Sequence, residues 1–214
     1  MNILYEDQRV LVCLKPYGVV STDEPGGLPS LLRKHLGDDK ACVRTVHRLD
    51  QVVGGVMVLA RSKKAAQLLS AQVQERSFGK EYLAVVHGTP QPQQGTLRDL
   101  LFRVKAQRKT IVVDEPGKDV QEAVLDYETL AQKNGLSLVK IHLRTGRTHQ
   151  IRAQFSHHSC PLVGDGKYGA PELADLEGIA LWSRYIAFDH PQTGQRMAFE
   201  APPPETYPWN LFNC

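Results

Sequence analysis

Apolar and polar residues alternate in several short runs along this chain, and each run predicts a β-strand. The first run spans residues 9–15 and ends at Lys15-Pro16-Tyr17-Gly18, where proline and glycine break the pattern. Later runs predict strands at 43–46, 55–61, 80–88, 97–104, 110–113, 122–130 and 136–143, and a closing hairpin over 186–200. The segments between the strands after residue 88 are too short for crossover helices, so we expect antiparallel hairpins there.

Three other segments have the apolar spacing and end signals of helices. One runs from Pro29, which suits a first turn, to a stop at Gly37. Ser62 can cap a second helix, in which apolar residues recur every four positions. Thr148 can cap a third, in which Ile151 and Phe155 face the core.

These elements predict an α+β fold with a mixed, mostly antiparallel central sheet flanked by helices. The chain has 214 residues, no internal repeat and no linker long enough to separate independent domains. We therefore expect residues 1–214 to form a single domain.

Composition narrows the class of protein. Hydrophobic residues make up 42% and charged residues 23%, which is ordinary for a globular protein. The longest apolar run, 52–60, is far shorter than the roughly 20 residues that span a bilayer. Acidic Glu6 and Asp7 stand where a signal peptide would carry positive charge, so we expect a cytoplasmic protein without a membrane segment. Cys13, Cys42, Cys160 and Cys214 are scattered without a Cys-x-x-Cys pair, and we read them as free thiols.

Positive charge is concentrated in one part of the chain. The net charge is only +3, yet no acid occurs between Glu128 and Asp165, a window that holds five lysines and arginines and four histidines. A polyanion could bind there, and a solvated basic face is the alternative. The four clustered histidines could indicate a metal site. However, His157 and His158 are adjacent, so their side chains diverge on a helix, and the sequence signatures of zinc hydrolases and deaminases are absent. We expect no metal site.

The candidate chemistry begins at His47-Arg48-Leu49-Asp50, a short polar segment that leads into the apolar strand at 55–61. The commonest role of such an aspartate is to satisfy backbone amides in a turn. A nucleophilic carboxylate instead needs a nearby cation that favours its ionised form. Arg48 lies two residues away, on the same face if the segment is extended but not if it turns tightly, so a more distant arginine must also be considered.

Seven ordered motifs stand along nearly the whole length of the chain: Ile3-Leu4-Tyr5-Glu6-Asp7, Lys15-Pro16-x-Gly18, His47-Arg48-Leu49-Asp50, Lys80-Glu81-Tyr82-x-Ala84, Thr145-Gly146-Arg147-Thr148-His149-Gln150-Ile151-Arg152, Gly164-Asp165 with Lys167-Tyr168-Gly169, and His190-Pro191-x-Thr193-Gly194. Through these motifs the chain resembles the RluA-type RNA pseudouridine synthases. The resemblance implies the pseudouridine synthase fold and an enzyme that isomerises uridine in ribosomal or transfer RNA. It also implies that no metal or organic cofactor is used.

Three catalytic residues follow from the resemblance. Asp50 matches the carboxylate that forms a covalent intermediate with the nucleotide, either by attack on the ribose or through a glycal route. Arg152 matches the basic residue that pairs with that aspartate. Tyr82 matches the tyrosine that packs against the target base and assists proton removal at carbon 5; a half-buried strand aromatic is the alternative reading for it.

Four further residues are assigned to substrate binding: His47, Arg48, Arg147 and Ile151. Arg48 matches the residue that fills the gap left by the extruded base, a role suited to a planar cation that stacks. Arg147 is expected to contact phosphate, with solvation of a turn as the alternative. Lys15-Pro16-Tyr17-Gly18 is read as a structural turn, with a mobile loop over the site as the other possibility.

The match is loosest at Val53-Gly54-Gly55, where the family pattern leads us to expect a threonine or valine followed by serine and glycine. We expect this change to affect turn geometry. We also expect no N-terminal S4-type RNA-binding module, a monomer and no obligatory protein partner. A catalytically inactive RNA-binding relative and a nucleoside hydrolase that uses Asp50 are the alternative functions.

Overall fold

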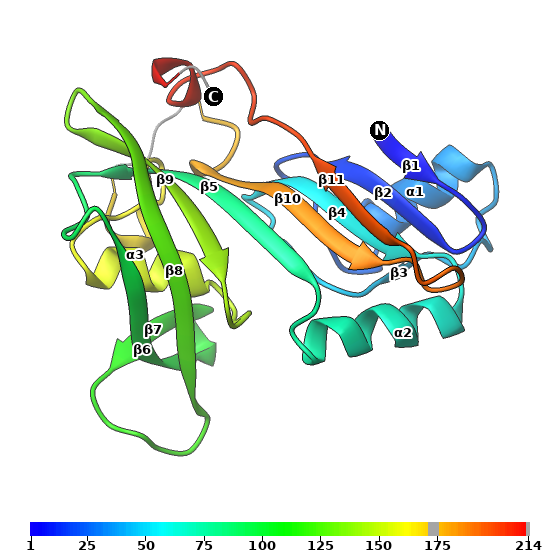
Figure 1. Ribbon diagram of the computed structural model, residues 1–214, viewed down its shortest axis with the longest axis horizontal. Coiled ribbons are helices and arrows are strands. Elements are labelled where there is room, and N and C mark those ends of the chain that lie inside the picture. Colours follow the sequence, from blue (N-terminus) through cyan, green and yellow to red (C-terminus); the bar gives the residue numbers. More distant parts are fainter. Residues whose placement is uncertain (171–175, 213–214) are drawn as a thin grey trace. The chain divides into compact units, whose positions relative to one another are not determined.

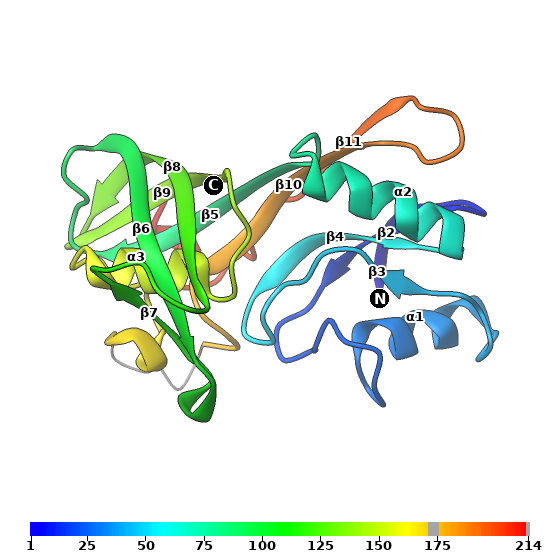
Figure 2. The ribbon, with the colours of Figure 1, turned by 90° about the horizontal axis from the view of Figure 1, so that it is seen from below.

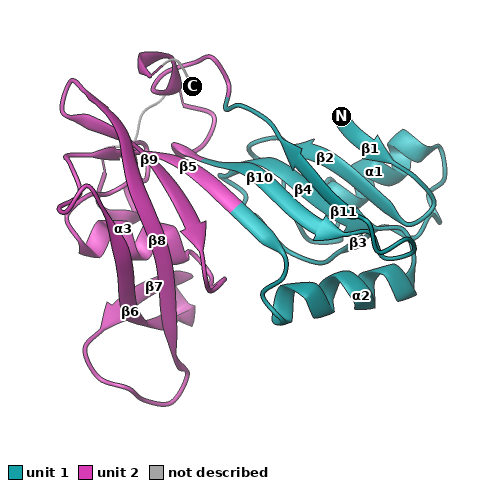
Figure 3. Ribbon diagram, viewed as in Figure 1, with its two compact units in different colours: residues 1–80, 182–203 teal, residues 81–181, 204–214 magenta. Residues whose placement is uncertain are grey.

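The computed structural model describes residues 1–170 and 176–212 (Figure 1). The chain forms two compact units, coloured separately in Figure 3. Unit 1 comprises Met1–Lys80 and Trp182–Pro203, and unit 2 comprises Glu81–Leu181 and Pro204–Cys214. Unit 2 is therefore largely an insertion into the sequence of unit 1.

Unit 1 contains a mixed sheet. Its strands are β1 (Asn2–Glu6), β2 (Val10–Lys15), β3 (Arg44–Thr45), β4 (Gly54–Ala60), β10 (Leu181–Asp189) from its second residue onward, and β11 (Arg196–Glu200). The strand order is β1-β2-β4-β10-β11, with β3 on β4. Every described pairing in unit 1 is antiparallel except that of β4 with β10, which is parallel through Trp182–Gly54 and Ser183–Gly55.

Two helices cover opposite faces of this sheet, as Figure 2 shows: α1 (Leu28–Leu36) and α2 (Lys63–Gln74). Alternate residues of β4, Val56 and Val58 among them, join the core beneath α2. Because both faces of the sheet are covered, every residue of β4 is buried, and the strand reads as an almost continuous apolar run.

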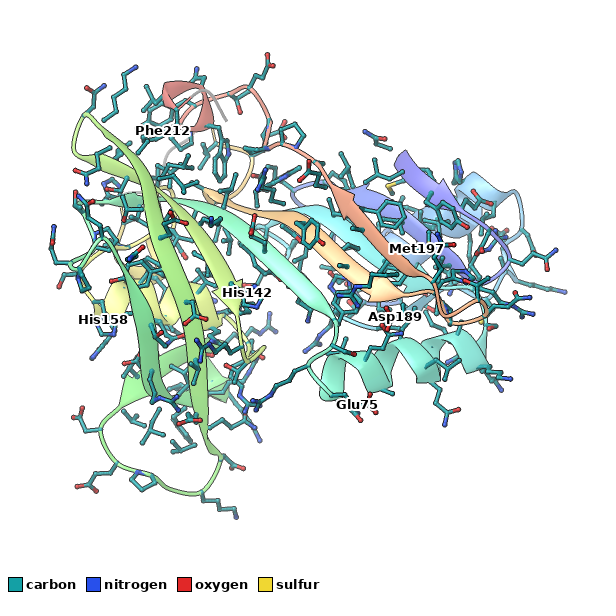
Figure 4. All side chains as sticks on the ribbon, viewed as in Figure 1. Glu75, His142, His158, Asp189, Met197 and Phe212 are labelled. Atoms are coloured by element: carbon teal, nitrogen blue, oxygen red, sulfur yellow. The ribbon has the colours of Figure 1, made fainter. Side chains whose placement is uncertain are left out.

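The ends of both helices follow from the sequence. Gly37 ends α1 in the left-handed conformation, with φ 66°. Ser62 caps α2, because its hydroxyl accepts a hydrogen bond from the backbone N–H of Ala65. Near the other end of α2, Gln72 bonds both backbone groups of Asp189, the labelled residue that ends β10 in Figure 4. These contacts confirm the two predicted helices of this unit.

Unit 2 contains an antiparallel sheet. Its strands are β5 (Gly79–His87) from Glu81 onward, β6 (Gln94–Val104), β7 (Lys109–Val113), β8 (Val120–Lys133) and β9 (Leu136–Leu143). They follow the order β5-β9-β8-β6-β7, and each neighbouring pair is antiparallel. The prediction of hairpins between successive strands is confirmed for β6–β7 and β8–β9. It is wrong for the other two connections, because β8 pairs with β6 and not with β7, and β5 pairs with β9 and not with β6.

Helix α3 (Gln150–His157) packs against the sheet of unit 2, where Ala153 joins a core with Leu101 of β6 and Tyr168. Three short 3₁₀ segments complete the unit: η1 (Lys105–Gln107), η2 (Gly166–Tyr168) and η3 (Trp209–Leu211). The prediction that Thr148 caps α3 is wrong. The cap residue is His149, with φ 54° and no side-chain cap bond, while the carbonyl of Thr148 accepts from the Thr110 hydroxyl.

The predicted α+β class with a mixed sheet is confirmed, whereas the assignment of 1–214 to a single domain stays a prediction. The sequence pattern missed β1 and the parallel pairing of β4 with β10. Cys13, Cys42 and Cys160 are free thiols, and Cys214 lies outside the described residues. None of the helices in the described part of the chain is long and apolar enough to cross a membrane.

Candidate active site

Asp50 lies in a turn between β3 and β4 that is closed by its own backbone. The N–H of Val53 donates to the carbonyl of Asp50 at 3.0 Å. Just before the turn, the hydroxyl of Ser21 donates to the carbonyl of Leu49 at 2.7 Å and accepts from the N–H of Leu49 at 3.1 Å. The half-buried carboxylate of Asp50 is thus carried on a backbone fixed on both sides.

The loop that follows β2 binds the same turn. The N–H of Gly18 donates to the carbonyl of Gln51 at 2.9 Å, and the side-chain amide of Gln51 donates to the carbonyl of Gly18 at 3.0 Å. Lys15 lies below this junction with its side chain completely buried. The motif Lys15-Pro16-Tyr17-Gly18 therefore helps to hold the Asp50 turn in place. From the sequence we predicted only that this motif forms a structural turn.

His47 and Arg48 precede Asp50 but lie in different environments. His47 is only 7% exposed, and its Nε2 accepts a hydrogen bond from the N–H of Val58 at 3.2 Å. Burial, with a smaller contribution from the charge on Lys80, lowers the pKa of His47 to about 3. A neutral imidazole therefore ties the turn to β4, while the side chain of Arg48 is exposed.

The glycines at the start of β4 have a physical reason in unit 1. A Cβ on Gly54 would lie 2.5 Å from the ring of Trp182. Gly55 has φ 123°, and a Cβ there would lie 2.3 Å from the carbonyl oxygen of Ser183. The backbone of β10 thus approaches β4 so closely that only glycine fits, and the indole of Trp182 occupies the space where the family pattern has a serine side chain.

In unit 2, Tyr82 and Arg152 are both buried, at 6% and 5% exposure. Tyr82 lies on β5 opposite Ile141 of β9. The guanidinium of Arg152, on α3, binds Asp165 through two hydrogen bonds of 2.7 and 2.8 Å. Such a two-point contact fixes the plane of the guanidinium as well as its position.

An aromatic residue also contacts Arg152. The ring of Tyr168 lies 4.9 Å from the Arg152 guanidinium, and Lys109 lies 5.0 Å from the same ring. The phenol oxygen of Tyr168 is 2.8 Å from Nδ1 of His149 and accepts from the N–H of Thr110 at 2.9 Å. The Gly164–Gly169 motif thus packs on α3 and β7 and holds Arg152 in place.

Arg147 lies in the turn before α3. Its N–H donates to the side-chain oxygen of Gln150 at 3.0 Å, and its Nε donates to the carbonyl of Glu122 at 3.0 Å. Arg147 also lines a groove of about 520 Å³ in unit 2, together with Arg103 and Lys105. The groove has three cations to one acid, Asp119. Ile151, the next predicted binding residue, is buried in α3.

Two of the four histidines that suggested a metal site have other partners. His149 contacts Tyr168, and His158, labelled at the end of α3 in Figure 4, lies 3.2 Å from the carboxylate of Asp99. Within the described ranges, no group of three or more His, Cys, Asp or Glu side chains is arranged to hold a metal ion.

The predicted residues fall into two groups. His47, Arg48 and Asp50 share one turn in unit 1, and Tyr82, Arg147, Ile151 and Arg152 belong to unit 2. Sequence reasoning missed Lys15 and Asp165, although both stand within motifs that carry the family resemblance. A lysine at the end of a strand and an aspartate in a loop are usually exposed, so only the motifs themselves could have singled them out.

Solved structures show the class of protein. The human protein RNA Pseudouridylate Synthase Domain Containing 1 matches with a TM-score of 0.79 and 25% identity, over 96% of this chain and 84% of that one. The human protein RNA Pseudouridylate Synthase Domain Containing 4 matches with a TM-score of 0.79 and 24% identity, over 98% of this chain and 91% of that one. The α+β architecture is therefore the fold of RNA-modifying pseudouridine synthases.

Sequence comparisons give the family. The family model described as RNA pseudouridylate synthase matches residues 9–157. The chain is 36% identical over 214 residues to the RNA pseudouridine synthase YlyB of Bacillus subtilis, covering 96% of this chain and 70% of that protein. It is 36% identical over 230 residues to ribosomal large subunit pseudouridine synthase D of Pseudomonas aeruginosa, covering 99% and 71%. The chain belongs to the RNA pseudouridylate synthase family, and it is an isomerase that converts uridine in RNA to pseudouridine.

Proposed function

We propose that Asp50 is the nucleophile of this pseudouridine synthase and that a uridine of ribosomal RNA is its substrate. The observation that carries the proposal is the support of the Asp50 turn, which is bound by Ser21, Gly18 and Lys15. A catalytic carboxylate gains from such fixed geometry, because reacting atoms must already be aligned when the substrate binds. An ordinary turn aspartate would not need a buried cation beneath it.

The reaction itself is an isomerisation without loss of atoms. The glycosidic bond between N1 of uracil and C1′ of the ribose breaks, the base turns, and C5 bonds to C1′. The proton on C5 is lost, and N1 gains one. Asp50 would form the covalent intermediate, by attack on the ribose or through a glycal.

Tyr82 and Arg152 are proposed as the other catalytic residues, as the family motif implies. Tyr82 would pack against the base and assist proton removal at C5, and Arg152 would favour the ionised form of Asp50. The two hydrogen bonds to Asp165 support this role, because they leave the guanidinium little rotational freedom. Both assignments stay predictions.

RNA binding is assigned to residues of both motifs. The exposed side chain of Arg48 suits insertion into the space vacated by the flipped base, whose unstacking costs a few kcal/mol. Arg147 and the cations of its groove suit phosphate contacts. His47 and Ile151 are buried, and we propose that they shape these segments; their role in binding stays a prediction.

The substrate class rests on a relative. The Pseudomonas protein is named for the large ribosomal subunit, and its similarity covers 99% of this chain. We therefore place ribosomal RNA before transfer RNA among the candidates. The cytoplasm and a monomeric state go with this proposal. A catalytically inactive RNA binder is the alternative, but the retained Asp50 carboxylate would repel phosphate and serve no purpose there.

The test uses Asp50→Asn, a nearly isosteric change that removes the nucleophile. Pseudouridines are mapped in RNA from cells with and without the gene, and the purified protein is then incubated with RNA from the deletion strain. We expect Asp50→Asn to form no pseudouridine while binding RNA within about twofold of the wild type. Asp39→Asn, an exposed acid in the same unit, is the matched control and should be fully active. Pseudouridine formed by Asp50→Asn would overturn the assignment.

A further inference from the structure

One aromatic side chain near the Asp50 turn, that of Tyr17, has no role in the proposed reaction. Tyr17 lies in the loop after β2 between two exposed residues, Pro16 and Gly18, and its own side chain is half-buried. In the motif Lys15-Pro16-x-Gly18 it stands at the position that the family resemblance leaves open. A role for this tyrosine is therefore a property of this chain and not one that the family motif carries.

A buried indole holds the ring of Tyr17. The ring centroids of Tyr17 and Trp182 lie 5.8 Å apart, and the two planes are inclined at 49°. Trp182 is itself only 7% exposed, and its Nε1 donates to the carbonyl of Ala201 at 3.0 Å. The contact is tilted, so the anchored indole limits the movement of the phenol ring without stacking flat on it.

The loop that carries Tyr17 is bound to the turn of the proposed nucleophile. The N–H of Gly18 donates to the carbonyl of Gln51 at 2.9 Å, and the side chain of Gln51 donates back to the carbonyl of Gly18 at 3.0 Å. Gln51 directly follows Asp50. An added Cβ on Gly18 would meet no atom within 4 Å, so the space beside this junction is open. Tyr17 thus adjoins the residue that ties its loop to the Asp50 turn, next to space that a ligand can enter.

A held, half-exposed aromatic ring suits the base of an unpaired nucleotide. When the target uridine is flipped out of its stack, the base next to it loses a stacking neighbour. Every base has a π-face, so an aromatic side chain can take the place of that neighbour whatever the sequence. Such a contact requires an unpaired segment of RNA, because the bases of a duplex are already stacked on both sides.

We propose that Tyr17 stacks on the unpaired base of a nucleotide adjacent to the target uridine. This inference rests on the proposed role of Asp50. It gives the two exposed groups of this region different tasks, because Arg48 fills the gap left by the target base while Tyr17 binds the neighbouring base. It also narrows the substrate class: the modified uridine lies in a loop or another single-stranded segment of the RNA, not within a duplex.

The alternative is that Tyr17 only packs on Trp182 and keeps its loop in place. The two roles make different demands on the side chain. Packing needs an apolar group of similar size, whereas stacking on a base needs a flat aromatic face. Leucine supplies the first without the second, and phenylalanine supplies both. The variants Tyr17→Leu and Tyr17→Phe therefore separate the two roles.

The first experiment measures the kinetics of pseudouridine formation in RNA from the deletion strain. Tyr17→Leu should raise KM about tenfold, roughly what one base–aromatic stack contributes, and change kcat by less than about twofold. Tyr17→Phe should keep the wild-type kinetics. Tyr207→Leu, which changes an exposed tyrosine of unit 2, is the matched control and should also behave as the wild type. An unchanged KM in Tyr17→Leu would overturn the proposal, as would a Tyr17→Phe enzyme that is equally impaired.

The second experiment measures binding and does not depend on knowing the modified uridine. One probe is a single-stranded RNA in which uridine alternates with adenosine, and in the other an abasic residue replaces each adenosine. The wild type should bind the abasic probe about tenfold more weakly, whereas Tyr17→Leu should lose less than about twofold. Equal losses in the two proteins would overturn the proposal.

The wild type alone keeps this second experiment decisive if the variants fail to fold, because equal binding of the two probes would also overturn the proposal. Failure of the proposed function looks different. Asp50→Asn would then still form pseudouridine, while the binding results for Tyr17 would stand.

Discussion

Two buried cations, Lys15 in unit 1 and Arg152 in unit 2, are held in different ways. Arg152 is bound by the carboxylate of Asp165 within its own unit, whereas the hydrogen bonds of Lys15 to described residues go to three carbonyl oxygens. A guanidinium paired with a carboxylate keeps its charge at every working pH. Burial lowers the pKa of Lys15 to about 8, because the carbonyl oxygens only partly replace the water that solvates an exposed ammonium. The difference separates a permanent charge from one that titrates.

The largest effect should come from removing the carboxylate of Asp165, which binds Arg152. Asp165→Ala leaves a buried guanidinium without the carboxylate that binds it at two points, and we expect a loss of about 3–5 kcal/mol of unfolding free energy. Urea denaturation measures this loss. Lys15→Met should cost much less, because it removes the buried charge itself.

A paired substitution controls for packing at the same place. Adding Arg152→Met to Asp165→Ala removes both charges and should restore part of the lost stability. If Asp165→Ala proved no more harmful than Lys15→Met, the distinction between the two cations would fail.

Two glycines, Gly55 in unit 1 and Gly146 in unit 2, allow a second comparison of the units, with smaller expected losses of stability. Gly55→Ala places a Cβ 2.3 Å from the backbone of Ser183 at a φ of 123°, so β4 and β10 must move apart, at a cost of about 3 kcal/mol. At Gly146, in the Arg147 turn, an added Cβ would meet no atom within 4 Å, and Gly146→Ala should change stability by less than about 0.5 kcal/mol. Thermal unfolding of both variants checks this, and equal losses would contradict it.

The smallest effect concerns the helix caps. Ser62→Ala removes the hydroxyl that accepts from the N–H of Ala65, and it should cost about 1 kcal/mol. Thr148→Ala should be nearly neutral, because α3 begins at His149 without a side-chain cap. Denaturant titration of the two variants separates the cases. If Thr148→Ala lowered the free energy of unfolding as much as Ser62→Ala, Thr148 would cap α3 after all, which would contradict the structure.

Local signals predicted much of this fold, because they act over a few residues. Pro29, Gly37 and Ser62 each determine the backbone conformation or hydrogen bonds next to them, and the helices they delimit were predicted. Thr148 has the right residue type for a cap, but its carbonyl is held by Thr110 and the chain turns left-handed at His149. A tertiary contact overrode the local preference.

Contacts between distant residues could not be read from the pattern. Gly54 pairs with Trp182 in parallel, and the sequence of neither segment indicates that the two strands are neighbours. The seven motifs made Asp50 and Arg152 candidates for the site, a prediction that stands untested, and they did not reveal that Lys15 is fully buried or that Asp165 binds Arg152. Charged side chains are usually exposed, so their burial depends on which carbonyls or carboxylates the fold brings to them.

The interrupted sequence of unit 1 has a consequence for synthesis on the ribosome. β4 emerges early, but its parallel partner β10 follows only after the whole segment Glu81–Leu181 has been translated. At about 5–20 residues per second, the growing chain waits on the order of 5–20 seconds with that edge of β4 unpaired. Residues 81–181 are contiguous and can fold during this interval. The nascent enzyme therefore completes the surroundings of Gly54, four residues beyond its proposed nucleophile, among its last steps.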